Sequence, residues 1–184
     1  MVPRPPITAE QLERLGSAYH DFELVRGELV PVTPPGEEHG ILAVALASEL
    51  RSVVHPRGVG HVYVETGYTL FRTPDVVRGP DVSFRSSAHA TGTRARSGFI
   101  PGAPDLAVEI LSPDDALAEL VSKATEYLTA GARLVWLVDP RSRAVYVHRP
   151  GQQPQTLREG EVLDGEDVVP GFALPLSQFF AEPD

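Results

Sequence analysis

Apolar and polar positions alternate along the chain in a way that predicts strands interleaved with helices. Short, nearly continuous apolar runs occur at 106–111 and 132–140, and such runs are typical of strands covered on both faces. Between them, residues 114–130 have apolar positions at helical spacing, with start signals at Ser112–Asp114 and Gly131 at the end. A strand, a helix and a second strand in this order predict a right-handed parallel crossover.

Antiparallel strands are predicted on both sides of this crossover. Residues 21–32 form two β-rich runs around Arg26-Gly27, which is typical of a hairpin. Residues 60–71 alternate, and the short segments 80–84 and 143–150 also favour strands. We therefore expect an α/β fold, a mixed sheet with helices on its faces.

Two further helices and a polar loop complete the predicted elements. Thr8 to Gln11 is a capping box that opens a short helix ending near Gly16. Residues 85–104 form a polar loop, and the final LSQFF is expected to pack as a last turn. Residues 37–54 predict a long, well-buried helix, whose apolar positions are Ile41, Leu42, Ala45, Leu46, Leu50 and Val53.

Length and composition restrict the class of protein. A chain of 184 residues fits one domain, 1–184, with a real core. There is no cysteine, no apolar run long enough to span a membrane and no signal-peptide pattern, so a cytoplasmic protein is expected. The net charge of −9 disfavours broad nucleic-acid binding. Much of that charge lies in the acidic segment 151–184, expected to pack on the core, and the rest of the chain is nearly balanced.

One lysine stands out in a chain whose other basic side chains are arginines. Lys123 is the single lysine among 16 Lys and Arg residues, in the helix that follows Glu109. Arginine is always charged, whereas the pKa of a lysine can be moved, so a lysine kept here indicates chemistry that arginine cannot perform. The alternative is an exposed helical lysine without a role.

Two carboxylates accompany this lysine. Glu109 lies in the apolar strand 106–111, where a carboxylate is costly unless it is paired, protonated or bound to metal. Asp81 begins the strand at 80–84. The alternatives are a structural ion pair between Glu109 and an arginine, and an aspartate that stabilises a turn. Two carboxylates and a backbone carbonyl can hold one Mg²⁺, with water completing its octahedron.

The position of Lys123 on its helix permits such a site. At about 100° per residue, Lys123 lies about 120° from the centre of the apolar stripe, on a flank that it shares with Glu119 and Tyr127. From this flank a long side chain can reach the sheet edge. The stripe consists of Leu117, Leu120, Val121, Ala124 and Leu128.

The succession of segments resembles a known enzyme superfamily. FELVRGELV, a helix opened by His39, PDVSF, APDLAVEILSP and KATEYLTAGARLVWLVDP follow one another as in the PD-(D/E)XK nucleases, and most closely as in their Uma-type restriction-endonuclease-like branch. The resemblance extends over about residues 8–180. It implies the restriction-endonuclease core, a mixed sheet flanked by helices.

The resemblance also implies roles for individual residues. Asp81 and Glu109 are similar to the two acidic metal ligands of the motif, and the backbone carbonyl of Ile110 is similar to a third ligand. The motif lysine normally lies two residues after the second acid, where this chain has Leu111. In this branch it has moved to the next helix, to the place of Lys123.

Three further residues match the branch less directly. Glu23 and His39 match polar positions that would assist the site from the substrate side or behind the ligands. The alternatives are an exposed strand residue for Glu23 and a polar helix-start residue for His39. Glu119 stands where the branch usually has aspartate, which leaves a role there in doubt. The remaining histidines share no spacing typical of a zinc site.

The leading functional hypothesis is a Mg²⁺-dependent endonuclease that hydrolyses DNA, with Mn²⁺ as a substitute ion. Lys123 would orient or activate the attacking water, and Arg85, Arg94 and Arg96 are candidates for contacts with the DNA backbone. The alternative is a non-catalytic interaction or dimerisation module with the same fold. A glycosidase built on two carboxylates would leave the lysine unexplained. The resemblance also implies a homo-oligomer, expected to be a dimer.

Overall fold

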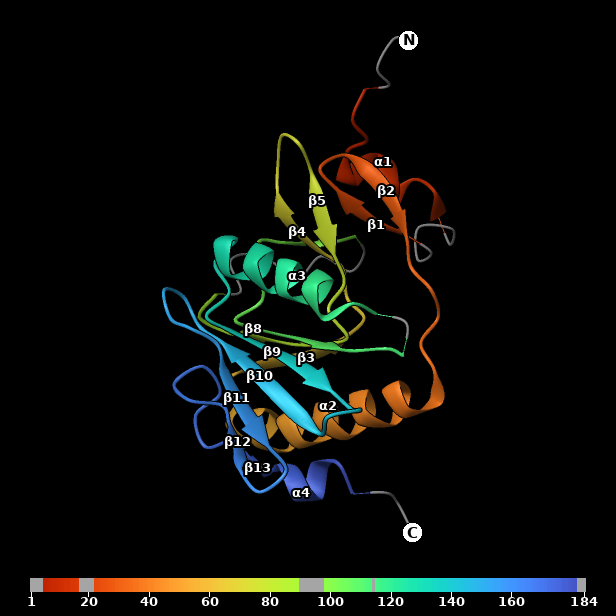
Figure 1. The fold of residues 1–184 in the computed structure, drawn as a ribbon. Helices are drawn as coiled ribbons and strands as arrows, with labels where there is room; N and C mark the ends of the chain where they lie inside the picture. Colours follow the sequence, from red (N-terminus) through yellow and green to blue (C-terminus); the bar gives the residue numbers. More distant parts are fainter. Residues whose placement is uncertain (1–4, 17–21, 90–97, 114, 182–184) are drawn as a thin grey trace.

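A six-stranded mixed sheet lies at the centre of the fold (Figure 1). The computed structural model describes residues 5–16, 22–89, 98–113 and 115–181. The strand order across the sheet is β11-β10-β9-β8-β6-β3. In chain order, its strands are β3 (Gly60–Val64), β6 (Val82–Ser86), β8 (Leu106–Ile110), β9 (Leu134–Asp139), β10 (Ala144–His148) and β11 (Gln155–Arg158).

The predicted strand–helix–strand unit is confirmed and supplies the middle of this sheet. β8 and β9 are parallel, with Val108 opposite Trp136, and helix α3 (Leu117–Thr129) joins them. β6 and β10 pair antiparallel with β8 and β9, which makes the sheet mixed, as expected. All of β8 is buried, which explains why its sequence is almost entirely apolar.

A second sheet lies above the α3 side and contains the predicted N-terminal hairpin (Figure 1). In the hairpin turn, Arg26 and Gly27 have positive φ angles of 51° and 82°. Helix α1 (Ala9–Glu13) begins with the predicted capping box of Thr8 and Gln11. In the order β2-β1-β5-β4-β7, the strands are β2 (Glu28–Pro31), β1 (Phe22–Val25), β5 (Val76–Arg78), β4 (Tyr68–Phe71) and β7 (Ile100–Pro101).

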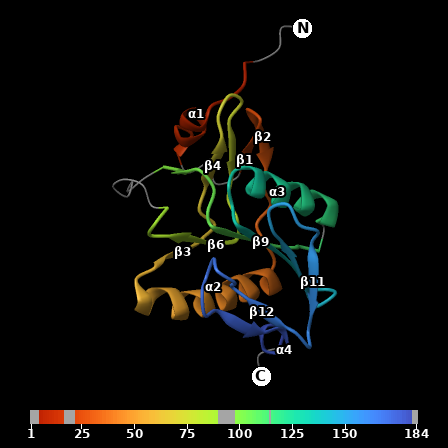
Figure 2. The ribbon, with the colours of Figure 1, turned by 90° about the vertical axis from the view of Figure 1, so that its left-hand side faces the viewer.

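Two helices cover opposite faces of the six-stranded sheet (Figures 1 and 2). Helix α2 (Glu37–Arg57) covers one face, where Leu46 and Trp136 belong to the larger apolar core. Helix α3 covers the other face, where Ala124 and Ala107 belong to a smaller core. Neighbouring residues of one strand therefore face different helices, as the pleat requires.

The end of the chain packs against the α2 side. β12 (Val162–Asp164) and β13 (Ala173–Pro175) pair antiparallel, and α4 (Leu176–Phe179) is the predicted last turn. Phe172 is tilted against Trp136, with 5.5 Å between the ring centroids. This contact joins the C-terminal segment to the larger core. No helix in the described part of the chain has the length and apolar character needed to cross a membrane.

Two predicted segments are divided differently in the structure. Residues 60–71 are two strands, β3 and β4, which belong to different sheets. The chain turns between them at Glu65, whose φ is 45°, and at Gly67, where the ring of Phe99 leaves no space for a Cβ. The expected loop 85–104 is not all loop, because its start belongs to β6 and its later part contains β7.

The helices are also less buried than predicted. In α2, Ile41 is 47% exposed and Val44 is 69% exposed. In α3, Leu117 and Val121 are 38% and 40% exposed, although both were expected in the buried stripe. α3 starts at Leu117 and ends at Thr129, shorter than the predicted 114–130, and Asp114 lies outside the described residues.

The buried face of α3 is turned toward Lys123 relative to the prediction. Its buried residues are Leu120, Ala124 and Tyr127. Measured from their centre at about 100° per residue, Lys123 lies only about 65° away. The prediction placed it farther off mainly because it counted Leu117, Val121 and Leu128, which are not buried, and it also left out the buried tyrosine.

Candidate active site

The candidate site lies where the carboxyl end of β8 meets α3. Val108 and Ile110 face the core on the α2 side, so Glu109, which lies between them, faces α3. Glu109 is 4% exposed. The fold thus places a carboxylate in a buried position where it needs partners.

α3 supplies a partner for each oxygen of this carboxylate. Lys123 Nζ donates to Glu109 Oε2 at 3.1 Å. The Tyr127 hydroxyl donates to Glu109 Oε1 at 2.7 Å. Because Lys123 and Tyr127 are four residues apart, they lie one helical turn apart on the same side of α3. Lys123 is therefore not freely exposed, which contradicts that alternative, and Glu109 does form an ion pair, with a lysine instead of the arginine considered from the sequence.

Burial and charge shift the pKa values of this group of residues. Burial, supported by the charges of Asp81 and Glu23, raises the pKa of Glu109 to about 7, although Lys123 and Tyr127 act in the opposite direction. Burial lowers the pKa of Lys123, but the carboxylates of Glu109 and Glu23 outweigh this effect and raise it. Burial raises the pKa of Tyr127, so its hydroxyl stays a donor. Lys123 is therefore a cation at neutral pH.

Glu23 joins the second sheet to the same cluster. Its Oε1 lies 3.4 Å from Lys123 Nζ, and its Oε2 accepts from Arg78 Nη1 at 2.7 Å. Arg78, on β5, also donates through Nε to Glu126 Oε2 on α3 at 2.8 Å. The exposed-strand alternative for Glu23 is wrong, since this residue is 8% exposed. The ion pairs of Glu23, Arg78, Glu126 and Lys123 form a ring that closes through α3, and Glu109 on β8 is attached to it through Lys123.

Asp81 lies directly before β6 and connects the site to α2. Its Oδ2 accepts from the backbone N–H of Ile110 at 2.6 Å. The same oxygen lies 3.1 Å from His39 Nε2. Burial lowers the pKa of His39, but Asp81 outweighs burial and the pKa is raised. His39 is 6% exposed, and its Nδ1 has no hydrogen-bond partner among the described residues.

The charges of this cluster suit a divalent cation. Glu23, Asp81, Glu109 and Glu126 face two permanent cations, which leaves two negative charges in excess when Glu109 is ionised and His39 is neutral. Within the described residues, no three His, Asp or Glu side chains are grouped closely enough to hold a metal ion. The role of Asp81 and Glu109 as metal ligands therefore stays a prediction. Two carboxylates are enough for Mg²⁺ in general, because this ion keeps waters and binds substrate phosphates.

Sequence reasoning missed two members of the cluster and included others that lie outside it. Arg78 and Glu126 were not singled out, because nothing in the sequence near either residue marks it as part of a site. Glu119 is exposed, and its side chain makes no ion pair with any described residue. Arg85 belongs to β6 and donates to the backbone oxygen of His89 at 3.0 Å. Arg94 and Arg96, the other proposed DNA contacts, lie outside the described residues.

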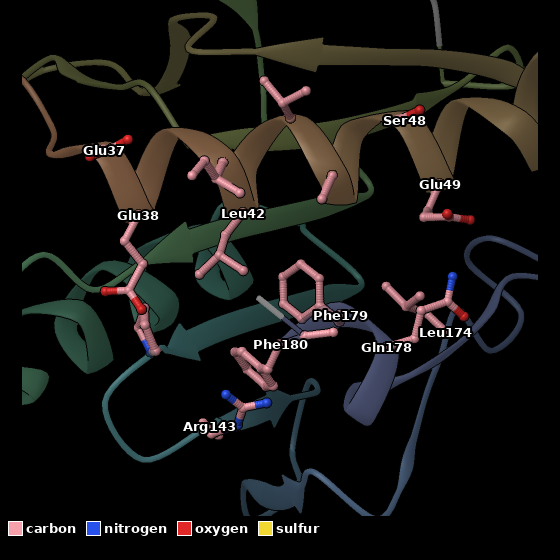
Figure 3. A pocket seen from close by; sticks show the side chains of 15 residues that line it. Glu37, Glu38, Leu42, Ser48, Glu49, Arg143, Leu174, Gln178, Phe179 and Phe180 are labelled. Atoms are coloured by element: carbon pink, nitrogen blue, oxygen red, sulfur yellow. The ribbon is translucent and has the colours of Figure 1, made fainter. Parts of the chain in front are cut away.

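A separate open pocket of about 740 Å³ lies between α2 and α4 (Figure 3). Its walls include Leu42, Phe179 and Phe180, with Glu38 and Glu49 along the α2 side. None of the residues proposed for the site lines it. The buried cluster at β8 and this apolar pocket are therefore distinct features.

Comparisons with known proteins agree with this fold. The profile of the family described as "Uma2: Putative restriction endonuclease" matches residues 9–177. A crystal structure described as a "putative nuclease belonging to DUF820" from Anabaena variabilis has a TM-score of 0.82 and 24% identity, and the match covers 95% of this chain and 98% of that one. This likeness establishes the restriction-endonuclease-like fold.

Two other comparisons carry no weight for function. The DrdV–DNA complex matches with a TM-score of 0.35 and 16% identity, over 77% of this chain and 14% of that one. This likeness is too slight to support an argument. Among curated proteins, none matches the sequence.

Proposed function

Because the chain belongs to the family described as "Uma2: Putative restriction endonuclease", we propose that it is a Mg²⁺-dependent endonuclease that hydrolyses phosphodiester bonds in DNA. The observation that carries this proposal is the buried Glu109, held between Lys123 and Tyr127 beside Asp81. Membership of a nuclease family and a carboxylate pair beside a lysine support the same chemistry.

Asp81 and Glu109 would hold the metal ion, with the backbone carbonyl of Ile110 as a third ligand. Mg²⁺, or Mn²⁺ in its place, would lower the pKa of a bound water and neutralise charge on the scissile phosphate. Asp81 is already oriented by the N–H of Ile110 and by His39. This fixed orientation reduces the reorganisation that ion binding would require.

Lys123 would act as a cation and not as a base. Its pKa is raised because the attraction of Glu109 and Glu23 exceeds the opposing effect of burial. A protonated ammonium can orient the attacking water by donating a hydrogen bond to the water oxygen, or it can stabilise negative charge on the phosphate. Glu23, at 3.4 Å from Lys123 Nζ, would keep the ammonium in place.

The proposal is tested by cleavage of supercoiled plasmid DNA with Mg²⁺, with Mn²⁺ and with EDTA. Asp81→Asn should reduce cleavage by more than the about 10–100-fold typical of groups that only support a metal ligand. Glu119→Gln is the matched control, because this exposed α3 carboxylate lies outside the cluster. Cleavage that persists in EDTA, or that is unchanged in Asp81→Asn, would contradict the proposed site.

One observation favours the alternative of a non-catalytic interaction module. The open pocket between α2 and α4 is lined in part by the exposed Ile41 and Val44. The same plasmid assay separates the two functions, since a module of this kind would bind Mg²⁺ without cleaving DNA or would bind no metal.

The homodimer expected from the family resemblance stays a prediction, which sedimentation of the wild type would check.

A further inference from the structure

Tyr127 is buried in a way that packing alone does not explain. It is 0% exposed, in the small core between α3 and the sheet. A phenylalanine would fill the same space, whereas a buried tyrosine requires a partner for its hydroxyl. That partner is Glu109 Oε1, at 2.7 Å. The hydroxyl of this core residue therefore makes its hydrogen bond to a residue of the candidate active site.

The hydrogen bond divides the two oxygens of Glu109 between two neighbours. Oε1 accepts from Tyr127 and Oε2 accepts from Lys123. The last torsion of a glutamate side chain is soft, so a carboxylate without fixed partners rotates easily. A partner on Oε1 fixes the plane of the group and hence the direction of Oε2.

A tyrosine is well suited to hold an oxygen that must stay negative. Its hydroxyl donates a hydrogen bond but brings no positive charge, so it does not neutralise the carboxylate as a second lysine or arginine would. Arg78, the nearest other cation of the ring, is bound to Glu23 and Glu126 instead. The cluster thus keeps its excess of negative charge close to Glu109.

We propose that Tyr127 is a positioning residue, which holds Oε1 of Glu109 so that Oε2 remains directed toward Lys123 and the metal ion; this role rests on the nuclease function proposed above. Tyr127 touches neither the ion nor the substrate and acts through Glu109. Partners that orient a metal ligand typically contribute about 10–100-fold to metal affinity or activity.

The direct test is calorimetric titration of Mn²⁺ alone into the wild type and Tyr127→Phe. The substitution keeps the buried ring and removes only the hydroxyl. We expect Mn²⁺ affinity to fall about tenfold or more. Measurement at low temperature, with folding confirmed by circular dichroism, separates the effect from stability, because a hydroxyl that only stabilises the fold would not change metal affinity in folded protein.

Tyr146→Phe is the matched control. Tyr146 packs against the same core cluster from β10, and its hydroxyl forms no hydrogen bond with the residues that the structure describes. This variant should bind Mn²⁺ like the wild type. Equal affinity of Tyr127→Phe and the wild type would overturn the positioning role and leave the nuclease proposal intact. No binding to the wild type would remove the metal site, and both proposals with it.

A second measurement covers the case in which Tyr127→Phe does not fold. The chain has five tyrosines, so wild-type protein labelled with ¹³C at the tyrosine Cζ gives a simple NMR spectrum. Addition of Mg²⁺ should shift a tyrosine resonance in the wild type but not in Asp81→Ala. If calorimetry shows Mg²⁺ binding and no tyrosine resonance moves, the proposal is overturned.

Discussion

The two faces of the six-stranded sheet differ in what they bury. The α2 face holds the large apolar core around Trp136, whereas the α3 face combines a smaller apolar core with the buried pair of Glu109 and Lys123. One strand serves both, because alternate residues of β8 point to opposite faces. Burial of apolar groups stabilises a fold, but burial of ion pairs often does not. We therefore expect the α2 face to contribute more of the stability, whereas the α3 face holds the site proposed for chemistry.

The largest effect is expected from a cavity in the α2 face. Trp136→Ala should lower the free energy of unfolding by about 3–5 kcal/mol, because Trp136 is 0% exposed and packs on Phe172. Urea unfolding measures this change. Val162→Ala is the control, since Val162 is 48% exposed, and it should change stability by less than about 0.5 kcal/mol. A loss below about 1 kcal/mol in Trp136→Ala would contradict the assignment of stability to this face.

The next effect concerns the charged ring on the other face. Arg78→Ala should lower the free energy of unfolding, measured with urea, by about 3 kcal/mol. The substitution leaves the carboxylates of Glu23 and Glu126 without the buried cation that they share. Arg143→Ala is the control, since the side chains of Arg143 and its partner Glu159 are 38% and 49% exposed and such pairs contribute less than about 1 kcal/mol. Equal losses in the two variants would show that burial of the ring has no energetic consequence.

The last effect should depend on pH. The pKa of Glu109 is raised to about 7, mainly by burial, so the folded protein binds this proton more tightly than the unfolded chain does. The contribution of Glu109 to the free energy of unfolding is therefore largest at low pH, and it is lost as the pH rises through about 7. Glu109→Gln cannot ionise and should therefore be more stable than the wild type at pH 8, by up to about 3 kcal/mol for a pKa raised from 4.5 to about 7, and by much less at pH 5.

Urea unfolding at both pH values tests this expectation, with Glu119→Gln as the exposed control. A wild type more stable than Glu109→Gln at pH 8 would show that the ion pair with Lys123 outweighs the cost of burial. Glu109 would then stabilise the fold, and the contrast between the two faces would disappear.

Local pattern was enough to predict the elements at the centre of the fold. β8, α3 and β9 were recognised because apolar runs and helical spacing are encoded within a few residues. The division of residues 60–71 between two sheets was missed, because an alternating run does not reveal which strand it pairs with. β5 has only three residues and was not predicted, so Arg78 was missed with it.

The sequence identified several residues of the candidate site but not the contacts between them. Lys123 was identified because it is the one lysine, and Glu109 because it interrupts an apolar strand. Their separation in space did not follow from the sequence, because it depends on which face of α3 is buried. Leu120, Ala124 and Tyr127 form that face, and Tyr127 bonds to Glu109 across the contact between α3 and β8.

The sequence by itself thus determined the element types, the apolar strands and the residue types able to hold a metal ion. Only the tertiary structure decided that Arg78 binds both Glu23 and Glu126. These two carboxylates lie 55 residues before Arg78 and 48 residues after it. The reason is physical. Periodicity records how each segment is buried, whereas an ion pair between distant segments depends on how those segments are placed against one another.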